Sequence, residues 1–133
     1  MSESKLDRDA LRRLTLDFTA AFNDNDLGAV MSRFAEGAVY DQFNDEPAQG
    51  IDAIRAAFEP QFKGAFGRMQ FLDEDLFIDA EARKTLVSWT CTLETKDGSA
   101  GWRGLDILHF DDRGKITQKL TYAKAKVPLL RAR

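Results

Sequence analysis

The fold is decided by the segment Trp102-Arg-Gly-Leu-Asp-Ile-Leu-His-Phe110, continued by Asp111-Asp-Arg-Gly114 and Lys115-Ile-Thr-Gln-Lys-Leu-Thr-Tyr-Ala123. Two runs rich in β-branched, aromatic and leucine residues flank four turn-forming residues. This pattern predicts a long β-hairpin in which Gly114 supplies a positive φ. The rest of the chain is expected to pack against this hairpin.

Asp106 stands in the middle of the first apolar run. A carboxylate buried among apolar side chains is costly unless a partner or solvent compensates it. The two-residue repeat of a strand places His109, the single histidine, on the opposite face, so a His–Asp pair within this strand is not expected. Asp106 is therefore the first functional candidate. The residues expected to share its face are Trp102, Gly104, Leu108 and Phe110.

The register of the hairpin decides what faces Asp106. If the turn pairs Phe110 with Lys115, Asp106 lies opposite Lys119, and the cation holds the carboxylate ionised. If the turn carries a glycine bulge, Leu120 lies opposite instead and a neutral Asp106 is expected. The sequence leaves both registers open.

Composition limits the class of protein. The 133 residues fit a single domain, 1–133, with 44% hydrophobic residues, 31% charged residues and a net charge of −3. This balance does not favour nucleic acid as a partner. No leader and no apolar run of about 20 residues is present, so we expect a cytoplasmic protein without a membrane span. A single cysteine, Cys91, excludes an intrachain disulfide and a cysteine-built metal site, and no cofactor is expected.

Apolar spacing predicts three helices in the first half of the chain. The first covers residues 5–24, and the second is a short helix capped by Asp26 that closes at Glu36-Gly37. The third opens near Ile51 and is expected to kink or end at Pro60, which has no N–H to donate.

The remaining segments predict strands. A short strand is expected at 38–43, and four strands follow from Arg68 onward, with a bulge or a bent edge at Asp73-Glu-Asp75. This order predicts an α+β domain in which three N-terminal helices pack on one face of a curved antiparallel sheet.

Three segments resemble the nuclear-transport-factor-2-like or ketosteroid-isomerase-like superfamily, which includes SnoaL-like proteins. They are Asn25-Asp-Leu-Gly-Ala-Val-Met-Ser-Arg-Phe-Ala35, Gly50-Ile-Asp-Ala-Ile-Arg55 and Leu105-Asp-Ile-Leu-His-Phe-Asp-Asp-Arg-Gly-Lys-Ile116. The resemblance implies a cone-shaped α+β fold. It says less about activity, because the superfamily includes isomerases, dehydratases, polyketide cyclases and members without a known reaction.

Resemblance to the steroid isomerases of this superfamily implies two catalytic residues. Val39-Tyr-Asp41, followed by Gly50, is similar to the segment that carries their base, so Asp41 matches the base. Asp106 matches the aspartic acid that stays protonated and donates to the oxyanion. The tyrosine of the first helix is replaced by Phe18, which has no hydroxyl, and this argues against steroid isomerisation itself.

A pocket lined by aromatic side chains is expected inside the cone, and it suits a small apolar molecule. One hypothesis is a proton-transfer enzyme of isomerase, dehydratase or cyclase type that uses Asp41. The alternative is a non-catalytic ligand-binding or dimerisation module, with Asp106 paired to Lys119 and Asp41 simply ending a strand. The expected ligand-binding residues, which are also candidates for plain core packing apart from Lys119, are Phe18, Phe22, Phe58, Phe62, Met69, Phe71, Trp89, Trp102 and Lys119.

The opposite face of the sheet is also apolar. If helices do not cover this face, it is too apolar for solvent, and we expect a homodimer that packs through it. The residues assigned to this face are Leu105, Ile107, Ile116, Leu120 and Tyr122.

Overall fold

The computed structural model describes residues 6–42, 46–65, 67–95 and 98–124. The helices are α1 (Arg8–Asn23), α2 (Leu27–Met31) and α3 (Ile51–Phe62). The strands are β1 (Phe34–Asp41), β2 (Ala48–Gln49), β3 (Arg68–Asp79), β4 (Lys84–Thr95), β5 (Gly98–Phe110) and β6 (Ile116–Lys124).

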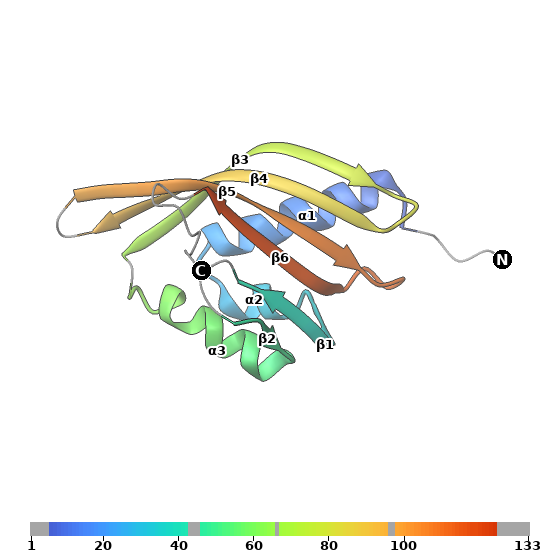
Figure 1. The fold of residues 1–133 in the computed structure, drawn as a ribbon, viewed down its shortest axis with the longest axis horizontal. Coiled ribbons are helices and arrows are strands. Elements are labelled where there is room, and N and C mark those ends of the chain that lie inside the picture. Colours follow the sequence, from blue (N-terminus) through green and yellow to red (C-terminus); the bar gives the residue numbers. More distant parts are fainter. Residues whose placement is uncertain (1–5, 43–45, 66, 96–97, 125–133) are drawn as a thin grey trace, which may run out of the picture.

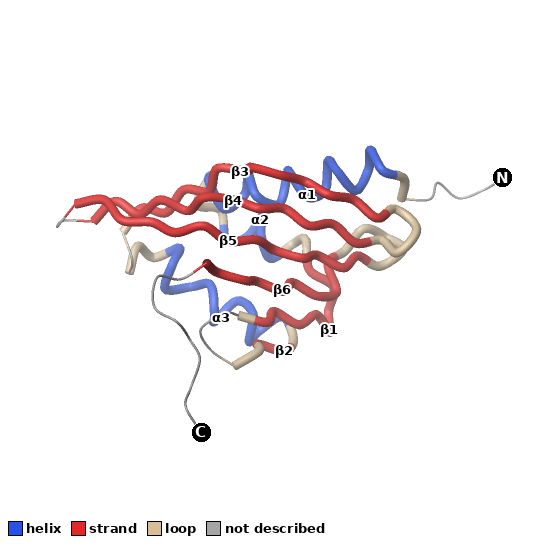
Figure 2. Tube along the Cα trace, turned by 45° about the horizontal axis from the view of Figure 1, so that its top comes forward, coloured by secondary structure: helices blue, strands red, loops and turns tan. Residues whose placement is uncertain are grey.

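The six strands form one sheet in the order β2-β1-β6-β5-β4-β3. Figures 1 and 2 show this sheet bent around the helices, which lie on one of its faces. The predicted α+β architecture is confirmed. One pair departs from the antiparallel prediction, because β1 runs parallel to β6 while the other neighbours are antiparallel. The parallel pair joins the first third of the chain to its last strand.

The helix starts follow from side-chain caps. The Ala10 N–H donates to Asp7 Oδ1 at 2.8 Å where α1 begins, and the Ala29 N–H donates to Asp26 Oδ1 at 3.0 Å where α2 begins. The cap predicted at Asp26 is confirmed. The prediction that the second helix extends to Glu36-Gly37 is wrong, because α2 ends at Met31 and the chain enters β1 at Phe34. Pairing with β6 takes precedence over the helical spacing there.

Pro60 does not end α3, which continues through Phe62. Proline removes a single hydrogen bond from the helix interior, the one that its own N–H would donate to Ala56. Beyond it, the Lys63 N–H still donates to the Glu59 carbonyl at 2.9 Å. The helix therefore ends two residues after the position at which the sequence predicts a kink or a stop.

A bulge in β6 sets the register of the β5–β6 hairpin. Phe110 pairs with Ile116, but the preceding His109 pairs with Gln118, so Thr117 is an extra residue on β6. The turn itself is as predicted, since Gly114 has a φ of 83°.

Neither predicted register is correct. Asp106 lies opposite Thr121, one residue beyond Leu120 and two beyond Lys119, and Lys119 lies opposite Leu108. The bulge also changes which side chains at the start of β6 face inward. Ile116, assigned by the sequence to the outer face, is 1% exposed and belongs to the inner core.

The strand β3 is irregular and lies at the edge of the sheet, as predicted. Its register with β4 shifts between Asp73 and Leu76. The side chain of Asn23, the last residue of α1, binds this strand like a neighbouring backbone: its amide donates to the Phe71 carbonyl at 2.8 Å, and its oxygen accepts from the Phe71 N–H at 2.7 Å. The contact fixes the edge strand to the helix beneath it.

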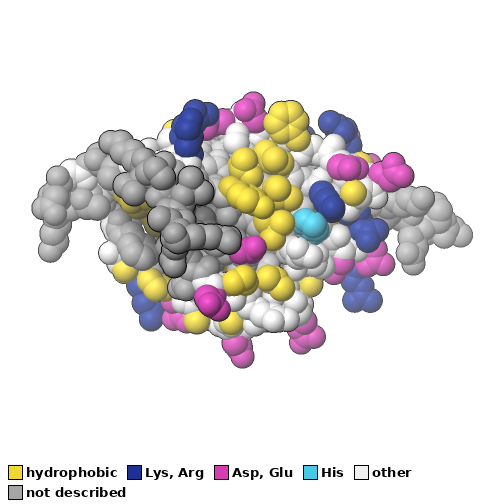
Figure 3. Space-filling view, viewed as in Figure 1, with side chains coloured by type: hydrophobic (Ala, Val, Ile, Leu, Met, Phe, Trp, Pro, Cys, Tyr) yellow, Lys and Arg dark blue, Asp and Glu magenta, His cyan; other side chains and the backbone are white. Residues whose placement is uncertain are grey.

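Apolar side chains also gather on the outer face of the sheet, next to the single histidine (Figure 3). Phe77 is 63% exposed and Tyr122 is 55% exposed, and Leu105, Ile107 and Leu120 on the same face are half-buried. Within the described ranges, no helix has the length and apolar character needed to cross a membrane.

The contact between Asn23 and β3 predicts a stability effect. In Asn23→Ala both backbone groups of Phe71 lose their partners, so the free energy of unfolding should fall by about 1–3 kcal/mol in urea denaturation. The control is Asp24→Ala, at the neighbouring exposed position, which should change it by less than about 0.5 kcal/mol. Equal effects of the two substitutions would contradict the assigned role of Asn23.

A homodimer that packs through the apolar outer face of the sheet remains a prediction. Light scattering at micromolar concentration should give twice the 15.0 kDa of the chain. Leu120→Lys places a charge in the apolar face and should give a monomer, whereas Ala53→Lys, on the exposed side of α3, should leave the mass unchanged. A monomeric wild-type protein would contradict the prediction.

Candidate functional site

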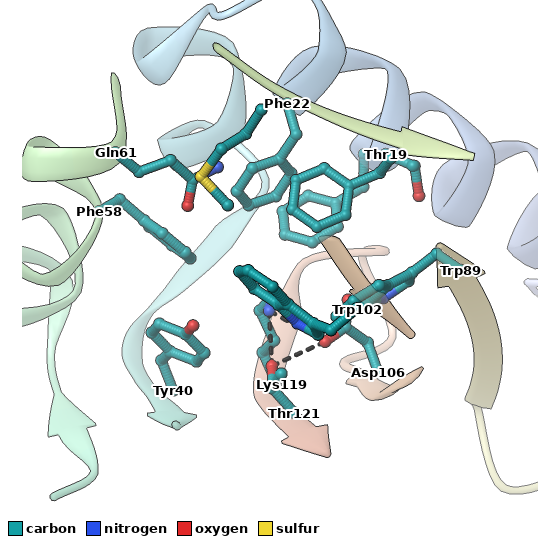
Figure 4. Close-up of a pocket in the computed structure, with 13 residues that line it drawn as sticks. Thr19, Phe22, Tyr40, Phe58, Gln61, Trp89, Trp102, Asp106, Lys119 and Thr121 are labelled. Carbon is teal, nitrogen blue, oxygen red and sulfur yellow. Dashed lines mark hydrogen bonds and ion pairs between the residues drawn. The ribbon is translucent and has the colours of Figure 1, made fainter. Parts of the chain in front are cut away.

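A pocket of about 80 Å³ lies between the inner face of the sheet and the helices α1 and α3 (Figure 4). Its lining comes from α1, α3 and every strand except β2. The lining residues are Phe18, Thr19, Phe22, Tyr40, Phe58, Gln61, Met69, Phe71, Trp89, Trp102, Asp106, Lys119 and Thr121.

The aromatic wall is centred on Phe22. Its ring centroid lies 5.1 Å from that of Phe18, 5.2 Å from that of Phe58 and 5.8 Å from that of Phe71, in edge-to-face arrangements. Tyr40 stacks on Phe58 at 4.7 Å. These contacts are within the range that stabilises aromatic pairs beyond simple burial, so the wall is a packed unit.

Trp89 reaches the pocket across a glycine. A Cβ on Gly104, the residue opposite it on β5, would lie 2.5 Å from Cη2 of Trp89 and 2.6 Å from the Tyr122 carbonyl oxygen. Glycine at this position therefore lets the indole lie flat over β5. The indole Nε1 then donates to Asp106 Oδ2 at 3.1 Å.

A buried ion pair forms the polar end of the pocket (Figure 4). Lys119 Nζ donates to Asp106 Oδ1 at 3.0 Å and to Thr121 Oγ1 at 2.7 Å, and Thr121 Oγ1 donates to Asp106 Oδ1 at 2.7 Å. Lys119 is 4% exposed and Asp106 is 8% exposed. Because Lys119 is diagonal to Asp106 on the neighbouring strand, its side chain meets the carboxylate without being directly opposite.

The surroundings of Lys119 keep it charged. Burial lowers the pKa of its ammonium and is the largest single effect, but the Asp106 charge, the Tyr40 phenol and the hydrogen bond to Asp106 together raise the pKa above its ordinary value. The ammonium also lies 4.4 Å from the centroid of the Tyr40 ring, a cation–π distance. Lys119 is thus a hydrogen-bond donor in the pocket rather than an amine nucleophile.

Asp106 is an acceptor in all of its described hydrogen bonds. The Lys119 ammonium, the Thr121 hydroxyl and the Trp89 indole N–H all donate to it. A protonated acid that donates to an oxyanion, the role implied by the steroid isomerases, does not fit these contacts. The arrangement corresponds to the ionised alternative, in which Lys119 pairs with the carboxylate.

The structure does not bring Asp41 to the pocket. Asp41 is the exposed last residue of β1, and it is Tyr40, on the opposite face of that strand, that lines the pocket. Asp41 and Asp106 are therefore not arranged as a base and a donor around one cavity. The expectation fails because strand alternation places Ala38 and Tyr40 inward, and their neighbours outward.

The structure places most of the predicted ligand-binding residues together. Eight of the nine line the pocket, and Phe62 does not. Phe62 packs behind the wall instead, with its ring centroid 5.6 Å from that of Phe22. Phe18, at the position of the missing tyrosine, lines the pocket with its ring alone.

Four lining residues are not among the predicted site residues: Thr19, Tyr40, Gln61 and Thr121. Thr121 shares a strand face with Lys119, so period-two alternation from Lys119 could have found it. Thr19 follows Phe18 in α1, and helical spacing gives no reason to prefer it over its neighbours.

The other reactive side chains lie elsewhere. Burial raises the pKa of Cys91 to about 11, so its thiol is unreactive at neutral pH. Burial and the nearby Lys84 lower the pKa of His109, which faces outward. Among the described residues, no three His, Cys, Asp or Glu side chains are grouped so that they could hold a metal ion.

Helices packed on one face of a bent six-stranded sheet give this chain an NTF2-like fold, shared with an NTF2-like protein from Burkholderia pseudomallei at a TM-score of 0.74. The model of the SnoaL-like domain matches residues 16–119, most of the chain, and the chain belongs to this family. No curated protein matches the sequence.

Solved structures share the fold at low identity. A protein of unknown function with a cystatin-like fold from Methylobium petroleophilum PM1 has a TM-score of 0.78 and 18% identity, covering 98% of this chain and 86% of that one. The epoxide hydrolase/cyclase-like enzyme SalBIII has a TM-score of 0.78 and 15% identity, covering 89% and 93%. A putative polyketide cyclase from Xanthomonas campestris pv. campestris has a TM-score of 0.72 and 21% identity, covering 88% and 92%.

The buried ion pair predicts opposite results for single and double substitutions. Lys119→Met leaves the Asp106 carboxylate buried without its cation and should lower the free energy of unfolding by about 3–5 kcal/mol. The double variant Lys119→Met/Asp106→Leu removes both charges and should recover most of that loss. Urea denaturation of both variants measures the difference, and additive losses would show that the two residues do not act as a pair.

Proposed function

We propose that this SnoaL-like domain binds a small, largely apolar molecule in the pocket, with the ligand's polar group at the Lys119–Asp106 pair. The observation that carries the proposal is the placement of this pair at the end of an aromatic pocket. A buried ion pair is not needed for stability, because well-packed apolar residues of similar volume usually stabilise a fold equally well. Ionisable groups with shifted pKa values in a cleft are, by contrast, typical of functional sites.

The lining supports a ligand of this kind. Ligand pockets are mostly apolar and aromatic, with a few polar groups that fix the orientation of the ligand. Here the rings of Phe22, Phe58 and Trp89 supply apolar surface, and Lys119 and Thr121 supply the polar groups at one end.

A second candidate function is proton transfer in the manner of an isomerase, dehydratase or cyclase. The observation that favours it is the Lys119 ammonium, a fixed donor that could stabilise negative charge on a substrate oxygen. Asp106, rather than Asp41, is then the carboxylate within reach of the substrate. Two solved structures with a similar fold are described as cyclase-like or as a putative cyclase, and they support this candidate by analogy of fold.

Closing the pocket tests the binding function. Gln61 lines the pocket from α3, and Gln61→Trp should fill its space, so the affinity for a single-ring probe such as acetophenone should fall at least tenfold in an NMR titration (about 1.4 kcal/mol). Arg55→Trp, at an exposed position of the same helix, is the matched control and should bind like the wild type. Binding that survives Gln61→Trp unchanged would locate the ligand elsewhere.

A further inference from the structure

At the polar end of the pocket, Lys119 has an N–H to offer a ligand. An ammonium has three N–H groups. Among the described residues, the acceptors for the Lys119 ammonium are Asp106 Oδ1 and Thr121 Oγ1. The third N–H is left among the rings of the wall, where Tyr40 lies at 4.4 Å and Phe58 at 5.7 Å from Nζ to the centroid. A ring face is a weaker acceptor than an oxygen, so a ligand oxygen would improve this contact.

The charges at this end of the pocket disfavour an anion. The Asp106 carboxylate lies 3.0 Å from Lys119 and already balances its charge. Asp73 pairs with Trp89 at the edge of the sheet, and burial and the charge of Asp106 raise the pKa of its carboxyl. An anionic ligand would therefore meet an ion pair without a net positive charge.

A cationic ligand is disfavoured for a different reason. Aromatic cages bind cations through the faces of their rings. In this pocket the rings at the polar end already contact a cation, since the Lys119 ammonium lies 4.4, 5.7 and 5.8 Å from the ring centroids of Tyr40, Phe58 and Phe22. A second cation would be repelled by the first.

The volume limits the ligand's size. The pocket measures about 80 Å³, whereas an engineered apolar cavity of roughly 150 Å³ is large enough to hold benzene. A fused multi-ring molecule would have to displace the packed aromatic wall. Because the pocket is smaller than that cavity, a single ring fits only with part of it at the open mouth, and nothing larger than one ring enters without such rearrangement.

We propose that the pocket selects an uncharged, single-ring molecule with a carbonyl oxygen, and that this oxygen accepts the third N–H of Lys119. The inference rests on the proposed binding function and adds the chemical class of the ligand. Lys119 is the specificity-determining residue, and the Asp106 carboxylate and the Thr121 hydroxyl direct its remaining donor toward the ring-lined space.

Four probes that share one benzene ring test the proposal. Acetophenone carries an uncharged carbonyl, ethylbenzene has no polar group, benzoate is an anion and phenyltrimethylammonium is a cation. Titrations followed through the indole N–H signals of Trp89 and Trp102 should show acetophenone binding roughly tenfold or more tighter than the other three, as expected for a hydrogen bond to a charged donor. Tighter binding of benzoate or of phenyltrimethylammonium would overturn the proposal.

The double variant Lys119→Met/Asp106→Leu isolates the donor without leaving a buried charge unpaired. It should lose the preference for acetophenone over ethylbenzene. Lys84→Met, which removes an exposed lysine outside the pocket, should keep that preference. If acetophenone and ethylbenzene bind the wild type equally, the ligand class is wrong and the binding function stands; if no probe binds, both fail.

Discussion

The arrangement of the site depends on one interaction, the ion pair between Lys119 on β6 and Asp106 on β5. Two opposite charges with little exposure are tolerated when hydrogen bonds compensate for the lost water, and here the Thr121 hydroxyl and the Trp89 indole N–H add to the bond between them, with one N–H of Lys119 left among the rings. The pair therefore specifies the positions of Trp89 and Thr121 as well. An apolar replacement would fill the same space, but it would leave the pocket without any charged group at its end.

The bulge at Thr117 is what brings this pair together. The extra residue turns Ile116 into the core and also leaves Lys119 and Thr121 on the inner face of β6. Without the bulge, strand alternation would put Ile116 and Lys119 on opposite faces. A single local irregularity thus gives β6 an apolar end that belongs to the core and a polar end that faces the pocket.

The periodic spacing of apolar residues in the sequence predicts much of this architecture, but it predicts the site only in part. The alternation in β5 correctly predicted that Asp106, Leu108 and Phe110 share the buried face. The register of β6 could not be predicted, since threonine is an ordinary strand residue and nothing in the sequence marks Thr117 as a bulge. The strand β1 shows a second limit of prediction. Resemblance to the steroid isomerases favoured Asp41 as the catalytic base, whereas the pairing of β1 with β6 turns Tyr40 toward the pocket.

The parallel pairing of β1 with β6 has a consequence for biosynthesis. Residues 34–41 pair with residues 116–120, so their contacts close a loop of most of the chain. Such distant pairings are entropically costly and slow to form. On the ribosome, the helices and the β3–β4 hairpin can form while translation continues, but β1 must wait for β6 to emerge. Until then its hydrogen-bonding edge stays open to non-native strand pairing.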